Sequence, residues 1–174
     1  VDSVVASGND LTDNNTVTQA AGKLADAAQF TAPNNEYLSR VSNATLAMGA
    51  GIRMTLVVWV YPDTLNDAVA HEIAGKRDTY APTNDALEYA LRWVASSNKW
   101  SFFVSPNGET PITEVLVDDN TPTTAVWTLL ICWYDGTNIN IQANGGTVYS
   151  AAHSTDIFAG TNFFGIGRNN SPTE

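Results

Sequence analysis

One stretch constrains the fold of this chain more than any other: residues 127–146, which read WTLLICWYDGTNINIQANGG. Successive side chains of a β-strand point to opposite faces, so the apolar first half is typical of a strand covered on both faces. Asp135-Gly136 then provides a tight turn, and residues 138–143 alternate polar and apolar side chains. The stretch predicts a hairpin in which a central, doubly covered strand is followed by a strand with one solvated face.

Strand-like segments recur along the whole chain, and helical signals are scarce. We predict strands at residues 27–31, 36–41, 54–61, 71–76, 87–95, 99–105, 112–117, 126–134, 138–143, 147–151 and 162–167. Clusters of Pro, Asn, Asp and Gly separate them, as turns between strands require. No linker or repeat interrupts the series. The pattern predicts one all-β domain over residues 1–174, an antiparallel sandwich or jelly roll.

Charge and cysteine content exclude several function classes. Eight Lys and Arg face 18 Asp and Glu, a net charge of −10. This charge repels phosphate backbones, so we expect no nucleic-acid partner. No apolar run approaches the length of a membrane span, so we expect no membrane insertion. The single cysteine, Cys132, lies inside an apolar run, and we expect it to be buried in the core.

The order of the motifs is more specific than any one of them. Along the chain they read EYLSR, LVVWVYPDTL, HEIAGKRD, LEYALRW, VWTLLICWYDGTNINIQANGG and FFGIGR. This series resembles the laminin-G-like branch of the concanavalin A-like lectin and glucanase superfamily, over nearly all 174 residues. The resemblance implies a jelly-roll sandwich of two curved antiparallel sheets.

Two strands of that family pattern are missing from the sequence. Members of the family begin with a strand like AYWKLDE before the segment equivalent to residues 2–4, and end with one like GRIDEVGFW after the segment equivalent to residues 167–168. The resemblance implies that these strands lie side by side, so one sheet would have a gap with unpaired backbone groups. Two hypotheses stay open. Either the polypeptide is longer, or a neighbouring chain adds a strand in a homo- or hetero-oligomer.

The acidic residues do not form a glycosidase pattern. Glucanases of the superfamily carry E-x-D-x-x-E on one strand, which places two carboxylates on the same face. Here Glu72 and Glu88 each stand among apolar neighbours, and the adjacent Asp118 and Asp119 point to opposite faces of an extended chain. The sequence also contains no catalytic triad motif and no H-E-x-x-H motif. We therefore expect a protein that is not an enzyme.

Calcium is one cofactor that the resemblance implies. Many relatives hold Ca²⁺ at a rim of the sandwich with Asp or Asn side chains and carbonyl oxygens. The oxygen-rich segments 9–14 and 34–36 offer Asp10, Asp13 and Asn35 as candidate ligands. The alternative is that these segments are ordinary polar loop tips without a metal.

Aromatic side chains beside amides could bind sugar rings. We take Trp100, Trp93 and Tyr80, with Asn98, as the candidate ligand-binding residues. Trp100 follows a turn, where we expect it to be exposed at a hairpin edge. We expect the remaining tryptophans, Trp59, Trp127 and Trp133, in the core, because their strands are apolar on both faces.

These observations favour a non-catalytic binding or adhesion module. It would recognise a glycan or a protein surface, and would lie outside the cell, on a cell surface or on a virion. The alternative is a structural interaction domain of an assembly, such as a phage or virus decoration, fibre or capsid-associated protein.

Overall fold

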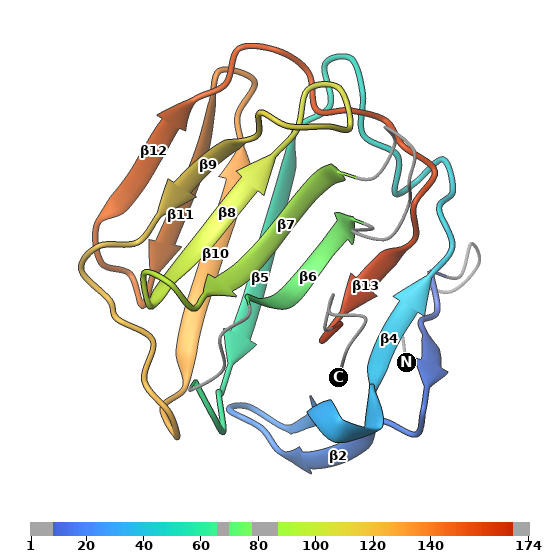
Figure 1. Ribbon diagram of the computed structural model, residues 1–174, viewed down its shortest axis with the longest axis vertical. Coiled ribbons are helices and arrows are strands. Elements are labelled where there is room, and N and C mark those ends of the chain that lie inside the picture. Colours follow the sequence, from blue (N-terminus) through green and yellow to red (C-terminus); the bar gives the residue numbers. More distant parts are fainter. Residues whose placement is uncertain (1–8, 66–69, 78–86, 169–174) are drawn as a thin grey trace.

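The computed structural model describes residues 9–65, 70–77 and 87–168. Within them lie thirteen β-strands and one short 3₁₀ helix, η1 (Ala32–Asn34). The larger sheet contains, in spatial order, β1 (Thr12–Asn14), β4 (Tyr37–Arg40), β13 (Phe164–Ile166), β6 (His71–Arg77), β7 (Leu87–Val94), β8 (Lys99–Val104) and β9 (Thr113–Leu116). The smaller sheet contains β12 (Val148–Ala152), β11 (Asn138–Ala143), β10 (Thr128–Tyr134) and β5 (Met54–Val60). The hairpin β2 (Thr18–Ala21)–β3 (Asp26–Gln29) stands apart from both sheets (Figure 1).

The predicted all-β jelly-roll fold is confirmed. Every predicted segment contains a strand, and all strand pairs are antiparallel. The prediction missed β1 and β2, whose sequences TDN and TQAA are mostly exposed and contain few residues with a strong preference for strands. None of the described helical residues forms a helix long and apolar enough to cross a membrane.

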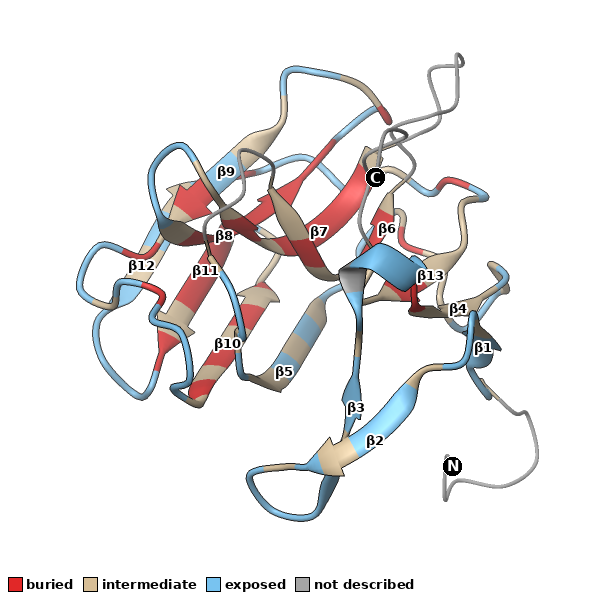
Figure 2. Ribbon diagram, turned by 60° about the horizontal axis from the view of Figure 1, so that its bottom comes forward, coloured by how far each residue is buried: buried red, intermediate tan, exposed pale blue. Residues whose placement is uncertain are grey.

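The two sheets face each other but are offset sideways. Strand β12 lies against β9, and β11 lies against β8 and β9. Continuing this order places β10 opposite β7 and β5 opposite β6. The larger sheet therefore extends past β5 by three strands, namely β13, β4 and β1, which have no strand of the smaller sheet opposite them in the part of the chain described here. The buried residues concentrate on the facing strands β7, β8, β10 and β11 (Figure 2).

Strand β10 shows how the smaller sheet divides its two faces. Leu130 and Cys132 point into the core and have no exposed surface, so burial of Cys132 is confirmed. Burial raises the pKa of the Cys132 thiol. On the other face Ile131 and Trp133 are half-buried, and no described strand covers them. The prediction of a strand covered on both faces is therefore wrong for the outer face.

The expected core positions of three tryptophans are also wrong. Trp59, Trp127 and Trp133 are each only half-buried. The Nζ atom of Lys23 lies 5.6 Å from the ring centre of Trp59, and the rings of Trp127 and Tyr61 are 5.1 Å apart. These side chains lie on the outer face of the smaller sheet or at its edge. No described strand covers the apolar residues there.

Candidate functional site

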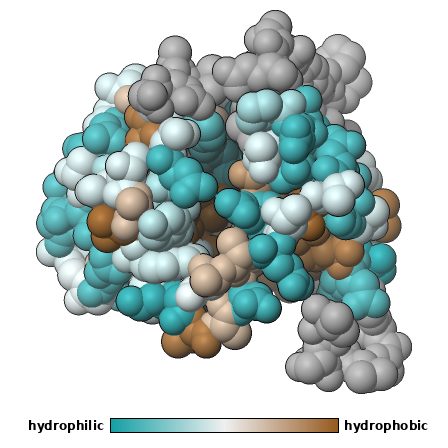
Figure 3. Space-filling model, turned by 90° about the horizontal axis from the view of Figure 1, so that it is seen from below, coloured by the Kyte–Doolittle hydropathy of each residue, from teal (hydrophilic) through white to brown (hydrophobic). Residues whose placement is uncertain are grey.

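A groove with a volume of about 920 Å³ opens where the smaller sheet ends at β5. One wall is β5 and the segment that follows it, and the other wall is the β2–β3 hairpin with the residues after β3. The strands β6 and β13 of the larger sheet close the groove between them. Seen from below, it appears as a hollow with apolar side chains at its bottom (Figure 3). The groove follows directly from the sideways offset of the two sheets.

The deep part of the groove is apolar and aromatic. Val58, Val60 and Ile73 line it together with Trp93 and Trp100. Trp93 and Trp100 are direct partners across the β7–β8 pair, and only 2% and 1% of their surfaces are exposed. The sequence prediction that Trp100 is exposed at a hairpin edge is therefore wrong. The residue does follow a turn, but its side chain points toward the facing layer.

The other predicted ligand-binding residues divide between the groove wall and other regions. Trp93 and Trp100 lie together in the wall. Asn98 lies in the β7–β8 turn with a φ of 49°, and its Oδ1 accepts a hydrogen bond of 2.9 Å from Nε1 of Trp93. This hydrogen bond from the β7–β8 turn fixes the orientation of the Trp93 ring. Tyr80 lies outside the described residues.

The indole N–H of Trp100 has no hydrogen-bond partner among the described residues. A buried donor without an acceptor costs about 1–3 kcal/mol. Although Trp100 belongs to the groove wall, its N–H is itself buried and is not open to a molecule in the groove.

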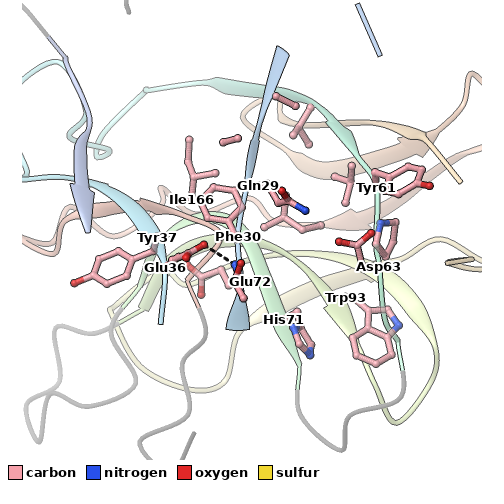
Figure 4. A pocket seen from close by; sticks show the side chains of 18 of the residues that line it. Gln29, Phe30, Glu36, Tyr37, Tyr61, Asp63, His71, Glu72, Trp93 and Ile166 are labelled. Carbon is pink, nitrogen blue, oxygen red and sulfur yellow. Dashed lines mark hydrogen bonds between the residues drawn. The ribbon is translucent and has the colours of Figure 1, made fainter. Parts of the chain in front are cut away.

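Polar side chains lie around the rim (Figure 4). The Glu36 carboxylate accepts hydrogen bonds from the Thr31 backbone N–H at 2.7 Å and from Nδ2 of Asn34 at 2.9 Å. The bond from Asn34, followed by that from Thr31, lowers the pKa of Glu36. Glu36 therefore holds the loop after β3 in place. On the opposite side Asp63 is exposed, just beyond the end of β5.

The edge of β5 that faces the groove is unpaired within the described chain. On its other side β5 pairs with β10 over all seven residues, from Met54 to Val60, without a register shift. Its sequence, MTLVVWV, contains no proline and no charge. Val57 at its centre is 63% exposed. The gap in one sheet that the family resemblance implies stays a prediction, and so does any strand that would fill it.

The calcium candidates lie on two segments that flank paired strands: Asp10 and Asp13 lie before and in β1, and Asn35 lies before β4. The side chain of Asp13 accepts a hydrogen bond from the Val17 N–H at 2.8 Å, and the Asn35 carbonyl accepts one from Nδ2 of Asn15 at 2.9 Å. Asp10 is exposed before β1. Within the described ranges, His, Cys, Asp and Glu side chains form no group of three or more that could hold a metal ion. Calcium binding stays a prediction.

A surface that adjoins the groove combines arginine and aromatic side chains, and we call it the arginine–aromatic surface; its Tyr37 and Arg168 also line the groove. Arg168 lies 4.4 Å from the ring centre of Phe163 and 6.0 Å from that of Tyr37, and these two rings stack at 6.3 Å. The ring of Phe103, which is itself buried, lies 5.5 Å from Cζ of Arg77 and 4.8 Å from Cζ of Arg92.

Acidic side chains lie among the arginines of the arginine–aromatic surface. Burial lowers the pKa of Arg77, the attraction of Glu72 offsets part of this effect, and the repulsion from Arg92 and Arg168 adds to it. Glu114 accepts a hydrogen bond of 2.8 Å from Arg92, whereas Glu72 is 3.8 Å from Nε of Arg77. The surface therefore brings several cations together in an otherwise acidic chain.

Comparison with known proteins decides the family. A laminin G family model, described as the concanavalin A-like lectin/glucanases superfamily, matches residues 25–174. The chain belongs to this superfamily. The match covers the smaller sheet, the larger sheet except β1, and the groove lining except the residues of β2, and it confirms the resemblance found in the sequence.

Solved structures of this superfamily fold are similar over most of the chain. The binding domain of Paraclostridial Mosquitocidal Protein 1 aligns with a TM-score of 0.72 and 10% identity, covering 92% of this chain and 40% of that one. Domain 4 of AbnA, a GH43 extracellular arabinanase from Geobacillus stearothermophilus, in complex with arabinotriose, aligns with a TM-score of 0.53 and 18% identity, covering 92% and 73%. No curated protein matches the sequence significantly. At these identities the similarity establishes the fold alone.

Proposed function

We propose that this superfamily member is a non-catalytic binding module whose groove receives a polypeptide segment of a partner protein. The observation that carries the proposal is the apolar groove that runs along β5, on the side where none of the described strands pairs with it. A polypeptide offers both apolar side chains for the groove and backbone amides for the strand edge. A sugar needs exposed aromatic faces, whereas Trp93 and Trp100 are buried in the groove wall.

Two further observations support a binding role. The similar structures include a toxin's binding domain and a domain in complex with arabinotriose. The acids considered for catalysis have structural partners instead: Glu88 pairs with Lys76 at 3.0 Å, and Asp118 accepts a hydrogen bond from Lys99. These contacts support structural roles for both carboxylates.

Selection of displayed peptides tests the proposal. A phage library of random twelve-residue peptides would be selected on the protein, and the enriched sequences measured against two variants. Ala28 lines the groove and is exposed, so Ala28→Trp should fill the groove and weaken binding at least tenfold. The matched control is Ala152→Trp, at an exposed position of β12 outside the groove, which should bind as the unmodified protein does. Absence of enriched peptides, or equal binding by both variants, contradicts the proposal.

Glycan binding is the second candidate function, and the arginine–aromatic surface favours it. Stacked rings beside guanidinium groups can hold a sugar ring and bond its oxygens, most strongly if the sugar carries a carboxylate or sulfate. A glycan array tests this function. Binding that is lost in Phe163→Ala and kept in Ala28→Trp would assign glycan recognition to this surface rather than to the groove.

A further inference from the structure

We propose that the outer face of the smaller sheet contains a binding site for a neutral glycan, in which the Trp133 ring stacks on a sugar ring. Trp133 does not line the groove, and it lies outside the arginine–aromatic surface. The inference therefore goes beyond the proposed function. The sugar would contact side chains on the face of the sheet, so the site does not depend on the edge of β5.

Trp133 belongs to a row of side chains that crosses the smaller sheet, and we call it the Trp133 row. On one side its direct partner is Thr55 of β5, and on the other it is Asn140 of β11. Ser150 of β12 continues the row beyond Asn140. Thr55 and Ser150 are exposed, and Trp133 is half-buried. Since Cβ atoms of such partners lie about 4.5–5.5 Å apart, the indole ring has a polar side chain on each side.

The Asn140 amide of this row is held in a fixed orientation. Its Oδ1 accepts a hydrogen bond of 2.6 Å from Oγ of Ser150. Its Nδ2 donates bonds of 3.3 Å to Oδ2 of Asp135 and to the Asn138 carbonyl. The exposed Ser150 hydroxyl still has lone pairs that can accept a hydrogen bond. An aromatic ring beside a few fixed polar groups suits a sugar, which needs both apolar contact and partners for its hydroxyls.

The composition of the smaller sheet favours a neutral ligand. None of its four strands contains a charged residue, although 15% of the residues of the chain are charged. Solvated protein surfaces ordinarily carry many charged side chains, so the composition of this face favours contact with a ligand. Nε of Arg53 bonds the Asp135 carbonyl at one end of the face, and Lys23 lies over the Trp59 ring at the other. The net charge of −10 disfavours an acidic sugar.

The size of the face favours a sugar over a second protein molecule. Four strands about 4.8 Å apart, each presenting about five residues of its length, span about 300 Å². A stable protein interface takes about 800 Å² from each partner. A short oligosaccharide is small enough to bind within this area.

Titration with oligosaccharides, followed by NMR, tests the inference. The neutral probes are cellohexaose, xylohexaose, mannohexaose and chitohexaose, and the acidic comparison is hexagalacturonic acid. The chain has five tryptophans, so the indole N–H signal of Trp133 can be assigned by its loss in Trp133→Tyr. We expect at least one neutral probe to bind with a Kd in the millimolar range or below and to shift this signal. The acidic probe should bind at least tenfold more weakly.

Three variants and a control locate the binding. Trp133→Thr should weaken it at least tenfold, whereas Trp133→Tyr should keep it within about threefold, because a ring remains for stacking. Thr55→Arg places a guanidinium beside the indole at an exposed position, where it can cover the ring, and should also weaken binding. This variant decides the matter if Trp133→Thr fails to fold. The control Val41→Thr removes an exposed apolar side chain beyond β4 and should bind as the unmodified protein does.

The other outcomes overturn the inference. Failure of all four neutral probes to bind at millimolar concentration does so, and so does unchanged binding in both Trp133→Thr and Thr55→Arg. Binding that is lost in Ala28→Trp or Phe163→Ala instead would place the glycan in the groove or on the arginine–aromatic surface. A Trp133 signal that shifts with protein concentration, together with a dimer in sedimentation equilibrium, would replace the glycan by a second copy. The selection of displayed peptides tests the groove alone, so the proposed function and this inference can fail separately.

Discussion

Nζ of Lys76 lies 3.0 Å from Oε1 of Glu88, and neither side chain is exposed to solvent. Lys76 also donates hydrogen bonds to Oγ of Ser42 at 3.0 Å and to the Gly160 carbonyl at 3.3 Å. These contacts tie β6 and β7 to the segments before β5 and β13. A buried ion pair offsets its desolvation only with such additional hydrogen bonds, so removing one partner leaves a costly isolated charge.

Breaking this pair should destabilise the protein strongly. At pH 8, where the Glu88 carboxyl is ionised, we expect Lys76→Met to lower the free energy of unfolding by about 3–5 kcal/mol, because this carboxylate is left buried without its cation. The double variant Lys76→Met/Glu88→Leu should recover much of that loss, since both charges are gone. Urea denaturation of the two single variants and the double variant measures the coupling. Additive effects of the two substitutions would contradict a pair that acts as a unit.

The pair should also make stability depend on pH. Burial raises the pKa of Glu88 to about 7, and the attraction of Lys76 offsets this only in part. Between about pH 4.5 and 7 the folded protein therefore holds a proton that the unfolded chain has released. The free energy of unfolding should fall over this interval as pH rises, by up to about 3 kcal/mol. Comparison with Glu88→Gln, which lacks the titration, isolates the effect, and parallel curves for the two proteins would disprove it.

The turn between β10 and β11 depends on Asp135. Its Oδ1 accepts hydrogen bonds from the N–H groups of Thr137 at 2.9 Å and Asn138 at 2.8 Å. These bonds hold the pKa of Asp135 below its ordinary value. The stabilisation is therefore complete above about pH 4 and is lost as the pH falls below it.

Asp135→Ala should accordingly unfold at a lower urea concentration than the unmodified protein at pH 7. The difference should shrink on acidification. Asp26→Ala, at an exposed position of β3, serves as the control and should leave the midpoint nearly unchanged. A difference between Asp135→Ala and the unmodified protein that persists unchanged at pH 2 would refute the role of the carboxylate.

Gly75 lets β6 approach β7 closely. A Cβ atom at this position would lie 2.6 Å from the Tyr89 carbonyl oxygen and 2.9 Å from Cα of Ala90. Since both contacts are with backbone, the strands would have to separate, and we expect Gly75→Ala to cost about 1–3 kcal/mol. Gly51→Ala tests the alternative explanation of backbone strain. Gly51 has a φ of +72° and open space around it, so its substitution should cost about 1 kcal/mol or less. Thermal unfolding of both variants measures the difference.

Alternation along single strands was enough to predict most of the fold. The patterns at residues 54–61 and 126–134 predicted the strands β5 and β10 correctly, because side-chain alternation is a local property, but they did not show that β5 lies at the edge of the described sheet. The same patterns did not reveal that Trp133 faces solvent while Trp100 faces the core. That distinction depends on which face of a strand meets the other layer.

The sequence predicted a gap in one sheet, but it did not predict the groove itself. The position of the groove follows from the sideways offset of the two sheets. The sequence of one strand does not show which strands of the other sheet lie opposite it. The pairing of Trp93 with Trp100 in its wall depends on the β7–β8 register. The one local signal was the uncharged run at residues 54–60, which matches an edge without protection.

The β2–β3 hairpin pairs only with itself among the described strands, so no backbone ladder fixes it to either sheet. Side-chain contacts, such as Lys23 above Trp59 and Phe30 against Gly167, hold it in place instead. The wall of the groove that this hairpin forms can therefore move without breaking a hydrogen bond to either of the two described sheets. The width of the groove could then adjust to larger or smaller side chains of a ligand. The same fold could therefore bind ligands of different sequence.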